Sequence, residues 1–489
     1  MTRIVRPARS RTAARSAPRL GVLTTVVGFL AAVEFTSGVL QGYYTPLLTD
    51  IARHLGIHDA DVNWLEGTQL MLSALVVPAF AKLGDLVGHK RMLLVSTAVT
   101  AVASLALPFI DSFPLFLAAW ALQGFYVVWL PLEIALIWSR SRALGAPAVL
   151  TARAAGILVA SLEAGAISGA LVGGALVDAL PLRVVLLIPA LCVAACFVVI
   201  LFGVAEGPHA DRGRFDTVGL VLVSLALIAF TGGLSLLRLG GPGDLAAWLV
   251  VLLGVGLFAP FALWERRHPD PLIDVRMFAD AALWPVFLTA GLFGVSVLGA
   301  QAPLSTFART DPAVHGYGLG TSGFSTSLII GLYLVAMIAG ALLYPLASRR
   351  ATPRSALVSA SVLVGAGYLL FLPLHDSYGQ VVVNMMIAGV GSGALVAALP
   401  AAAAAAAPPA QTGVATGLTN SVKTVGGAIA SCVFGIALLQ GVADGAGAAE
   451  GTAGSFAGYV TVWVVCGVTA LVAAAALLLV PKGAFSDPA

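Results

Sequence analysis

The sequence predicts an all-α protein that crosses a lipid bilayer many times. Hydrophobic residues make up 59% of the 489 residues, and charged residues only 10%. A soluble protein carries about 25% charged residues, because charged side chains keep its surface in water. The 54 glycines fit the same class, since membrane helices use small residues for close packing. Unpaired backbone groups are not tolerated in hydrocarbon and no alternating barrel pattern occurs, so the spans are expected to be helices.

Fourteen apolar segments are long enough to cross a bilayer, for which about 20 residues are needed. Polar and turn residues separate them, as is typical of loops between spans. The predicted spans cover residues 21–46, 63–82, 92–110, 114–137, 153–177, 183–204, 217–237, 245–264, 283–306, 323–346, 354–373, 379–402, 411–440 and 457–480.

The distribution of basic residues supports this count. With both termini on the cytoplasmic side, 21 of the 26 Lys and Arg residues fall on that side and four on the outer side, while Lys423 lies inside a span. This asymmetry follows the positive-inside rule. We therefore expect a multi-pass protein of the cytoplasmic membrane, with both termini in the cytoplasm and no nucleic-acid partner.

Cofactor-dependent chemistry is not expected. No His/Cys/Asp spacing is typical of a metal site, and no phosphate-binding loop is present, so neither a metal nor ATP-driven activity is predicted on this chain. The four cysteines lie in apolar runs and are expected to be packing residues. A membrane-embedded enzyme is a remote alternative, because the seven histidines fall mostly in loops.

The loop between the second and third predicted spans carries a recognisable motif. Residues 81–91 read AKLGDLVGHKR and resemble the G-x-L-x-D-R-x-G-R-K loop of the major facilitator superfamily, with Ala81 and Leu86 departing from it. We expect an acid and a basic cluster at a cytoplasmic helix end, where charge pairs latch two spans. An ordinary positively charged loop is the alternative. The motif residues are Gly84, Asp85, Gly88, Lys90 and Arg91.

The fifth predicted span carries a glycine pattern. It resembles the G-x-x-x-G-P-x-x-G-G signature of the antiporter branches of that family, with Ala170 in place of the proline. Small residues four apart let another helix approach closely, so generic helix packing is the alternative. The glycines are Gly165, Gly169, Gly173 and Gly174.

Further segments extend the resemblance along nearly the whole chain. Asn63-Trp64, Phe215-Asp216, the segment 264–274 (WERRHPDPLID) and the glycines between residues 412 and 427 are similar to the fourteen-helix drug:proton antiporters. The resemblance implies a major facilitator fold of 6+2+6 helices that works by alternating access. The implied parts are a basic tail (1–20), two six-helix bundles (21–204 and 283–480), a linker with two inserted helices (205–282) and a C-terminal tail (481–489).

Acidic residues within the spans are functional candidates, because an ionised carboxylate at the bilayer centre costs at least about 2.5–3.5 kcal/mol. Glu34 lies near the middle of the first predicted span, with Gln41 further along its face. The resembling family has a carboxylate at this place, in an L-D-x-T segment matched by residues 33–36. A proton and a cationic substrate would exclude each other at such a carboxylate. A structural buried pair is the alternative.

Three further acids are interpreted differently. Glu163 lies at mid-depth in the fifth predicted span and is either a second coupling carboxylate or a hydrogen-bond partner between helices. Glu133 is a turn or two from the inner end of the fourth span, where it either takes part in coupling or snorkels towards Arg140 or Arg142. Glu66 is expected to be interfacial, because it is close to the outer surface.

The fourth predicted span departs from the family pattern. The family often places an arginine, which attends proton transfer, a few residues before a Gln-Gly pair. Here Trp120 takes that place, ahead of Gln123-Gly124. An indole offers a flat surface for cation–π contact with a lipophilic cation, and packing at a helix interface is the alternative. We expect Trp120 and Gln123 to line a substrate cavity.

A basic residue lies inside the thirteenth predicted span. Lys423 shares a polar face with Asn420 and needs a partner or water at that depth. A carboxylate of the other bundle, Glu34 or Glu163, would give a state-dependent switch, and snorkelling to the inner surface is the alternative. The other predicted cavity residues are Gln41, Gln301, Asn384 and Asn420.

The resemblance implies a secondary transporter that exports hydrophobic or amphiphilic molecules, cationic or neutral, against inward proton flow. The alternative is an uncoupled or differently coupled carrier for another small solute, since the arginine of the fourth span is missing. The expected partners are a small hydrophobic substrate, protons and the lipid bilayer. Nothing in the sequence requires more than a monomer.

Overall fold

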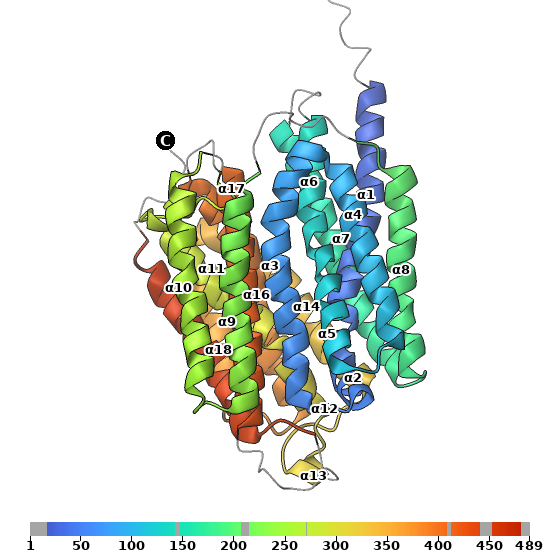
Figure 1. Ribbon diagram of the computed structural model, residues 1–489, viewed down its shortest axis with the longest axis vertical. Coiled ribbons are helices and arrows are strands. Elements are labelled where there is room, and N and C mark those ends of the chain that lie inside the picture. The colour runs from blue at the N-terminus through green and yellow to red at the C-terminus, as the bar shows by residue number, and fades with distance from the viewer. Residues whose placement is uncertain are drawn as a thin grey trace, which may run out of the picture.

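A computed structural model describes residues 17–141, 147–206, 215–269, 271–407, 412–440 and 452–480. These residues form long, roughly parallel helices joined by short connections, without a β-strand in the described ranges (Figure 1). The all-helical membrane fold predicted from composition is thus confirmed.

The helices fall into three groups along the chain. The N-terminal half contains α1 (Ala17–Tyr43), α2 (Leu48–Leu55), α3 (Val62–Val87), α4 (His89–Ala106), α5 (Phe113–Gln123), α6 (Trp129–Ser141), α7 (Pro147–Val177) and α8 (Leu182–Gly203). The inserted pair is α9 (Thr217–Gly240) and α10 (Leu245–Arg267). The C-terminal half contains α11 (Trp284–Gly294), α12 (Gln301–Arg309), α13 (Pro312–His315), α14 (Gly323–Arg350), α15 (Pro353–Leu369), α16 (Tyr378–Ala406), α17 (Thr412–Leu439) and α18 (Phe456–Leu477).

Thirteen segments of the described chain are long and apolar enough to cross a membrane. The helix α15 has 17 residues and is shorter than these. It lies where the span 354–373 is predicted and packs against α16 and α18. The predicted count of fourteen is therefore consistent with the structure, with α15 as the additional span.

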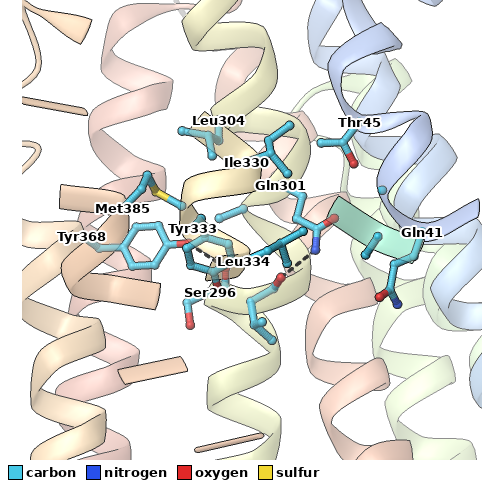
Figure 2. Close-up of a pocket in the computed structure, with 14 residues that line it drawn as sticks. Gln41, Thr45, Ser296, Gln301, Leu304, Ile330, Tyr333, Leu334, Tyr368 and Met385 are labelled. Carbon is cyan, nitrogen blue, oxygen red and sulfur yellow. Dashed lines mark hydrogen bonds between the residues drawn. The ribbon is translucent and has the colours of Figure 1, made fainter. Parts of the chain in front are cut away.

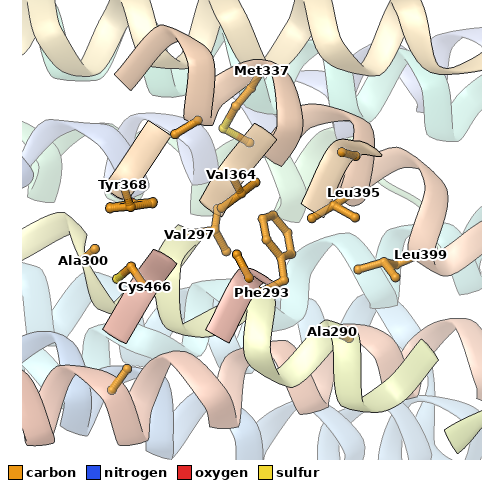
Figure 3. Packing of buried hydrophobic residues seen from close by; sticks show 14 of the residues in the cluster. Ala290, Phe293, Val297, Ala300, Met337, Val364, Tyr368, Leu395, Leu399 and Cys466 are labelled. Atoms are coloured by element: carbon orange, nitrogen blue, oxygen red, sulfur yellow. The ribbon is translucent and has the colours of Figure 1, made fainter. Parts of the chain in front are cut away.

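Buried apolar residues form two large clusters, one from each half. The N-terminal cluster draws on α1 to α8, and the C-terminal cluster on α11 to α18. In the C-terminal cluster Phe293, Val364 and Leu395 interdigitate from three helices (Figure 3). We propose on this basis that the two halves correspond to the expected bundles of residues 21–204 and 283–480.

One pair of helices packs closely in each half: α1 with α7 in the N-terminal half, and α11 with α17 in the C-terminal half. A Cβ at Gly165 of α7 would lie 2.1 Å from the Phe35 carbonyl oxygen of α1. In the C-terminal half, a Cβ at Gly426 of α17 would lie 2.1 Å from the Gly291 carbonyl oxygen of α11. Only glycine permits these approaches. Gly169 and Gly173 also face α1, whereas Gly174 faces the start of α14, so the glycine pattern packs α7 against both halves.

The inserted pair covers the seam between the halves. The helix α9 contacts both α3 and α17, and α10 packs on α9 (Figure 1). Arg238 of α9 forms an ion pair with Asp61, Nη2 to Oδ2 at 2.6 Å, and lies over the rings of Trp64 and Phe113. The pair is therefore attached to the N-terminal half by a half-buried charge contact as well as by apolar packing.

The halves are tied together at the end of the molecule where α13 lies, at the bottom of Figure 1; we call it the α13 end. Arg309 of α12 contacts Asp50 of α2 at 2.8 Å and Asp178, after α7, at 3.7 Å. Both carboxylate oxygens of Asp178 accept hydrogen bonds from the first amides of α14, Gly323 and Phe324, at 2.9 Å each. We call these five residues the Asp178 link.

Other contacts reinforce this closure. The Ser305 hydroxyl of α12 donates to the Thr45 carbonyl at 2.6 Å, and the Thr452 hydroxyl donates to Asp59 at 3.2 Å. Each bond joins one half to the other at the α13 end. Together with the Asp178 link they hold this end shut.

Candidate functional site

A cavity lies between the two halves. Its walls come from α1 and α7 on one side and from α12, α14, α15 and α16 on the other (Figure 2). They are mainly apolar and aromatic, with a few amide and hydroxyl groups. The residues shown around it include Gln41, Thr45, Ser296, Gln301, Leu304, Ile330, Tyr333, Leu334, Tyr368 and Met385. We call this space the tyrosine lobe.

A second cavity adjoins it. Gln41 and Gln301 line both spaces, so the two form neighbouring compartments of one site. The second compartment, which we call the Glu66 lobe, is lined by Leu40, Gln41, Tyr44, Glu66, Gln69, Leu70, Trp120, Tyr126, Leu298 and Gln301.

The site is built where two membrane spans are interrupted. The ninth span changes from α11 to a π-helical turn, Val295–Gly299, before α12 begins. Carbonyl groups at this turn accept bonds from side chains of the cavity wall: Gln301 donates to Val297 at 2.9 Å, and the Tyr368 hydroxyl donates to Ser296 at 2.7 Å. Such turns are frequent at functional sites because they release backbone groups from the helical ladder.

The fourth span is interrupted in a similar way by a 3-10 segment, Gly124–Val128, between α5 and α6. The Ser73 hydroxyl of α3 donates to the Gly124 carbonyl at 3.0 Å, and the Gln69 amide donates to the Trp120 carbonyl at 3.3 Å. The interruption therefore fixes α3 against the aromatic residues that line the Glu66 lobe.

Trp120 lies in this wall, as predicted. It is 1% exposed, and its ring centroid lies 4.9 Å from that of Tyr44 in an edge-on arrangement. Its indole N–H finds no acceptor among the described residues. Trp120 thus packs at a helix interface and also faces the cavity; its contact with a cationic substrate stays a prediction.

Gln123 lies behind the residues that line the Glu66 lobe and contacts one of them, Tyr44. Its side-chain amide donates to the Tyr44 hydroxyl at 2.8 Å and to Ser104 at 2.9 Å, and it is buried. It positions Tyr44 and does not line either lobe. Asn384 is also buried outside both lobes, where it donates to the Leu374 carbonyl at 2.7 Å.

Glu34 and Glu133 form a pair of carboxyls inside the N-terminal half. Both are 0% exposed, and none of their oxygens has a hydrogen-bond partner in the described chain. Their charges act on each other and on the Cys196 thiol, which places the pair among α1, α6 and α8. Neither residue lines either lobe.

The snorkelling interpretation of Glu133 is wrong. Arg140 instead contacts the carbonyl groups of Ala205 and Glu206 beyond α8. Arg142 lies outside the described residues. The Glu133 carboxyl is thus buried near Glu34 and Cys196 and is not paired with Arg140.

Glu163 and Lys423 face each other across the halves. The two charges act on one another, and Glu163 also acts on Tyr333 of the tyrosine lobe. Lys423 and Asn420 line a third, small cavity between α11, α16 and α17. Of the two carboxylates considered for Lys423, the structure therefore places Glu163 within its range.

Glu66 was expected at the membrane interface and was not assigned to a site. The residue lies about one turn into α3 and lines the Glu66 lobe with Gln41 and Gln301. A signal was present in the sequence: Glu66, Gln69 and Ser73 recur at helical spacing and give α3 one polar face.

Comparison with known proteins places these features in a family. The Major Facilitator Superfamily model matches residues 30–431, most of the chain. The chain belongs to the Major Facilitator Superfamily. It is accordingly a membrane transporter and not an enzyme. In the described ranges, no group of three or more His, Cys, Asp or Glu side chains could hold a metal ion.

Curated relatives in this superfamily are resistance and export proteins. The chain is 27% identical to the tetracenomycin C resistance and export protein of Streptomyces glaucescens, over 79% of this chain and 70% of that protein. It is 28% identical to a puromycin resistance protein of Streptomyces alboniger, over 82% and 78% of the two chains. A multidrug efflux pump of Mycolicibacterium smegmatis is 24% identical, over 88% and 82%.

Solved structures agree on the fold. A POT family transporter in complex with 5-aminolevulinic acid superposes with a TM-score of 0.68 at 16% identity, covering 92% of this chain and 95% of that one. The nucleoside transporter NupG superposes at 0.62 and 14% identity, covering 96% and 100%. At these identities the comparison supports the major facilitator fold alone.

The superfamily loop motif forms a latch with an unexpected acid. The backbone amides of Lys90 and Arg91 donate to the Glu206 carboxylate after α8, at 3.1 and 3.3 Å. Asp85, the acid expected to form the latch, instead lies 3.2 Å from His89. Gly88 has φ +119, and a Cβ there would lie 2.6 Å from a Glu206 oxygen. The motif glycine is therefore required by both the turn and the contact.

The Trp-Glu-Arg-Arg segment closes the inserted pair into a hairpin. The Trp264 indole donates to Asp216 at 3.0 Å, and Asp216 also caps α9 by accepting from the Gly219 amide at 2.8 Å. Glu265 accepts from the Ile273 amide at 3.4 Å. These motifs thus serve the architecture of the inserted helices and lie away from both lobes.

Proposed function

We propose that this transporter exports hydrophobic or amphiphilic small molecules by proton antiport, and that it works by alternating access. The names of its relatives support export, because they describe resistance, export and efflux of antibiotics and drugs. The apolar and aromatic lining of the tyrosine lobe supports a hydrophobic substrate, since such walls bind by burying apolar surface.

The buried carboxyls Glu34 and Glu133 carry the proposal of proton coupling. Two ionised carboxylates without a partner in a low-dielectric core would repel each other and would forfeit several kcal/mol of solvation, about 2.5 or more each. A proton is the smallest group that removes this cost. A pair that must gain protons to remain buried, and lose them when water enters, is suited to exchange protons for substrate.

Alternating access requires that one end of the site closes while the other opens. The Asp178 link and the bonds at Thr45 and Asp59 support a closed α13 end in this conformation. The electrostatic interaction between Glu163 and Lys423 acts across the two halves and would change when they rock apart. We propose that it is the state-dependent switch predicted for Lys423.

We further propose that the α13 end faces outwards and that both termini lie in the cytoplasm. The excess of basic residues at the opposite helix ends supports this orientation in the cytoplasmic membrane. Both lobes lie within a single chain, which supports a functional monomer.

Transport by purified protein in liposomes tests the coupling. An imposed pH gradient should drive accumulation of a lipophilic dye in wild-type vesicles and should be dissipated in step. Glu34→Gln and Glu133→Gln should each abolish gradient-driven accumulation while passive dye exchange continues. Glu265→Gln, a buried carboxylate of the inserted pair, is the matched control and should transport like wild type.

Two outcomes would count against the proposal. Gradient-driven accumulation by both Gln variants at the wild-type rate would remove Glu34 and Glu133 from coupling. Dye exchange by the wild type that ignores the gradient would favour an uncoupled carrier, the function suggested by Trp120 in place of the family arginine.

A further inference from the structure

Glu66 has surroundings unlike those of the other buried acids. Its carboxylate forms no ion pair and no hydrogen bond within the described residues, yet it faces a cavity rather than sealed packing. The other polar groups of the lobe are neutral: the amides of Gln41, Gln69 and Gln301 and the hydroxyls of Tyr44 and Tyr126. The lobe therefore contains one carboxyl group whose charge, when ionised, the described residues leave uncompensated.

The walls around this charge are aromatic. Tyr44 and Trp120 meet edge-on, and Phe116 stacks behind Trp120 with centroids 6.0 Å apart. The neutral Tyr126 side chain lies near Glu66 in the same lining. Aromatic faces attract organic cations, and this attraction grows when water is excluded. The uncapped indole N–H of Trp120, in a side chain that is 1% exposed, adds a donor without an acceptor in the same wall.

The geometry of the two lobes limits what kind of molecule fits them together. Gln41 and Gln301 form their shared boundary, so one ligand can extend from one lobe into the other. The tyrosine lobe has no charged side chain in its lining, whereas the Glu66 lobe has one acid. This asymmetry matches a molecule with an apolar ring system at one end and a single positive charge at the other.

We propose that Glu66 binds the protonated amine of an amphiphilic substrate whose ring system occupies the tyrosine lobe. This inference rests on the proposed export function and assigns its substrate class. The ammonium group would replace the missing counter-charge of Glu66, and its N–H groups would face the amide oxygens of the lobe. Trp120 would contribute a cation–π contact in the place where the family often has a positive charge.

The test compares two fluorescent ligands with the same pyrene ring system: 1-pyrenemethylamine, which carries a positive charge at pH 7, and 1-pyrenemethanol, which is neutral. Equilibrium binding is measured at pH 7 with the full chain in lipid nanodiscs, and the signal of empty nanodiscs is subtracted. Wild type should bind the amine at least about 10-fold more tightly than the alcohol, as expected for an ion pair shielded from water. Glu66→Gln should reduce that preference to about 2-fold or less.

The alcohol reports on folding of the site, because Glu66→Gln should bind it with unchanged affinity. Glu265→Gln should keep both wild-type affinities. An amine preference retained in Glu66→Gln, or no amine preference in wild type, would overturn the inference and leave the export function standing. Failure of wild type to bind either ligand would overturn the proposed hydrophobic site itself, and this inference with it.

Discussion

The Asp178 link makes the closure of the α13 end open to direct measurement. Replacing Asp178 with Ala removes both acceptors of the Gly323 and Phe324 amides, each at 2.9 Å, and one of the two carboxylates near Arg309. In this variant Arg309 should retain its ion pair with Asp50, in which Nη2 and Oδ2 lie 2.8 Å apart. The Asp178 side chain is 33% exposed, so solvent screening limits the loss. We expect about 1–2 kcal/mol, the usual effect of removing a helix N-cap.

Hydrogen exchange followed by mass spectrometry reports on these amides. A loss of about 1–2 kcal/mol corresponds to about 5- to 30-fold faster exchange at the start of α14. Asp178→Asn keeps one acceptor oxygen and should give an intermediate rate. Asp244→Ala removes the N-cap of α10, within the inserted pair, and should leave exchange at α14 unchanged. Exchange within 2-fold of wild type in Asp178→Ala would refute the role given to the link.

The link should also withstand mild acid. Burial raises the pKa of Asp178, but the amides of Phe324 and Gly323 and the nearby Arg309 outweigh this and hold it below its ordinary value. Because the folded-state pKa of Asp178 is the lower one, the contribution of Asp178 is complete above about pH 4 and is lost as the pH falls through that lower pKa. Protection of the two amides, corrected for intrinsic exchange, should therefore be constant from about pH 5 to about pH 8.

Three further predictions concern packing, each read from the midpoint of thermal unfolding in detergent. Gly88→Ala should lower the midpoint by destabilising the fold by about 1–3 kcal/mol, because the new Cβ is strained at φ +119 and would clash with the Glu206 carboxylate. An unchanged midpoint would contradict this prediction. Gly42→Ala should be strongly destabilising, since its Cβ would lie 2.1 Å from a carbonyl oxygen of α7, whereas Gly28→Ala on the same helix meets open space and should be neutral. Tyr368→Phe should cost about 1–2 kcal/mol by removing a buried hydrogen bond, and more than Tyr378→Phe at a half-buried site; equal effects would speak against it.

Much of the fold is predictable because the bilayer imposes it. A helix must supply about 20 apolar residues to cross, and basic loops must alternate sides, so span positions follow from composition. The interruptions inside spans are harder to predict. The π-helical turn at Val295–Gly299 and the 3-10 segment at Gly124–Val128 contain no proline or charged residue that would mark them, and tertiary hydrogen bonds from Ser73 and Tyr368 stabilise them.

The candidate site was predicted in part. The structure brings Gln41, Trp120 and Gln301 together around the cavity, and polar or aromatic side chains in spans tend to face a bundle interior. The position of Glu66 in the same lining was not predicted, since its depth was considered without its helical face. The acid of the loop latch, Glu206, lies far from Gly88 in the sequence, and only the fold brings them together.

The internal symmetry of the two halves was also hidden from the sequence. The glycines that pack α1 on α7 and α11 on α17 occur in segments with little similarity to each other. Close approach requires only a missing side chain at the crossing point, and the other positions are free to differ as long as they stay apolar.

The most direct test of proton antiport uses a substrate gradient to drive proton movement. Liposomes holding wild-type protein and no pH gradient are given an outward-directed gradient of 1-pyrenemethylamine, with an internal pH dye as readout. Antiport predicts that protons enter as the amine leaves, so the interior acidifies faster than in protein-free liposomes that control for amine leak. Glu34→Gln should abolish this excess. If the wild-type protein speeds amine efflux over that of protein-free liposomes but gives no excess acidification, the account is contradicted.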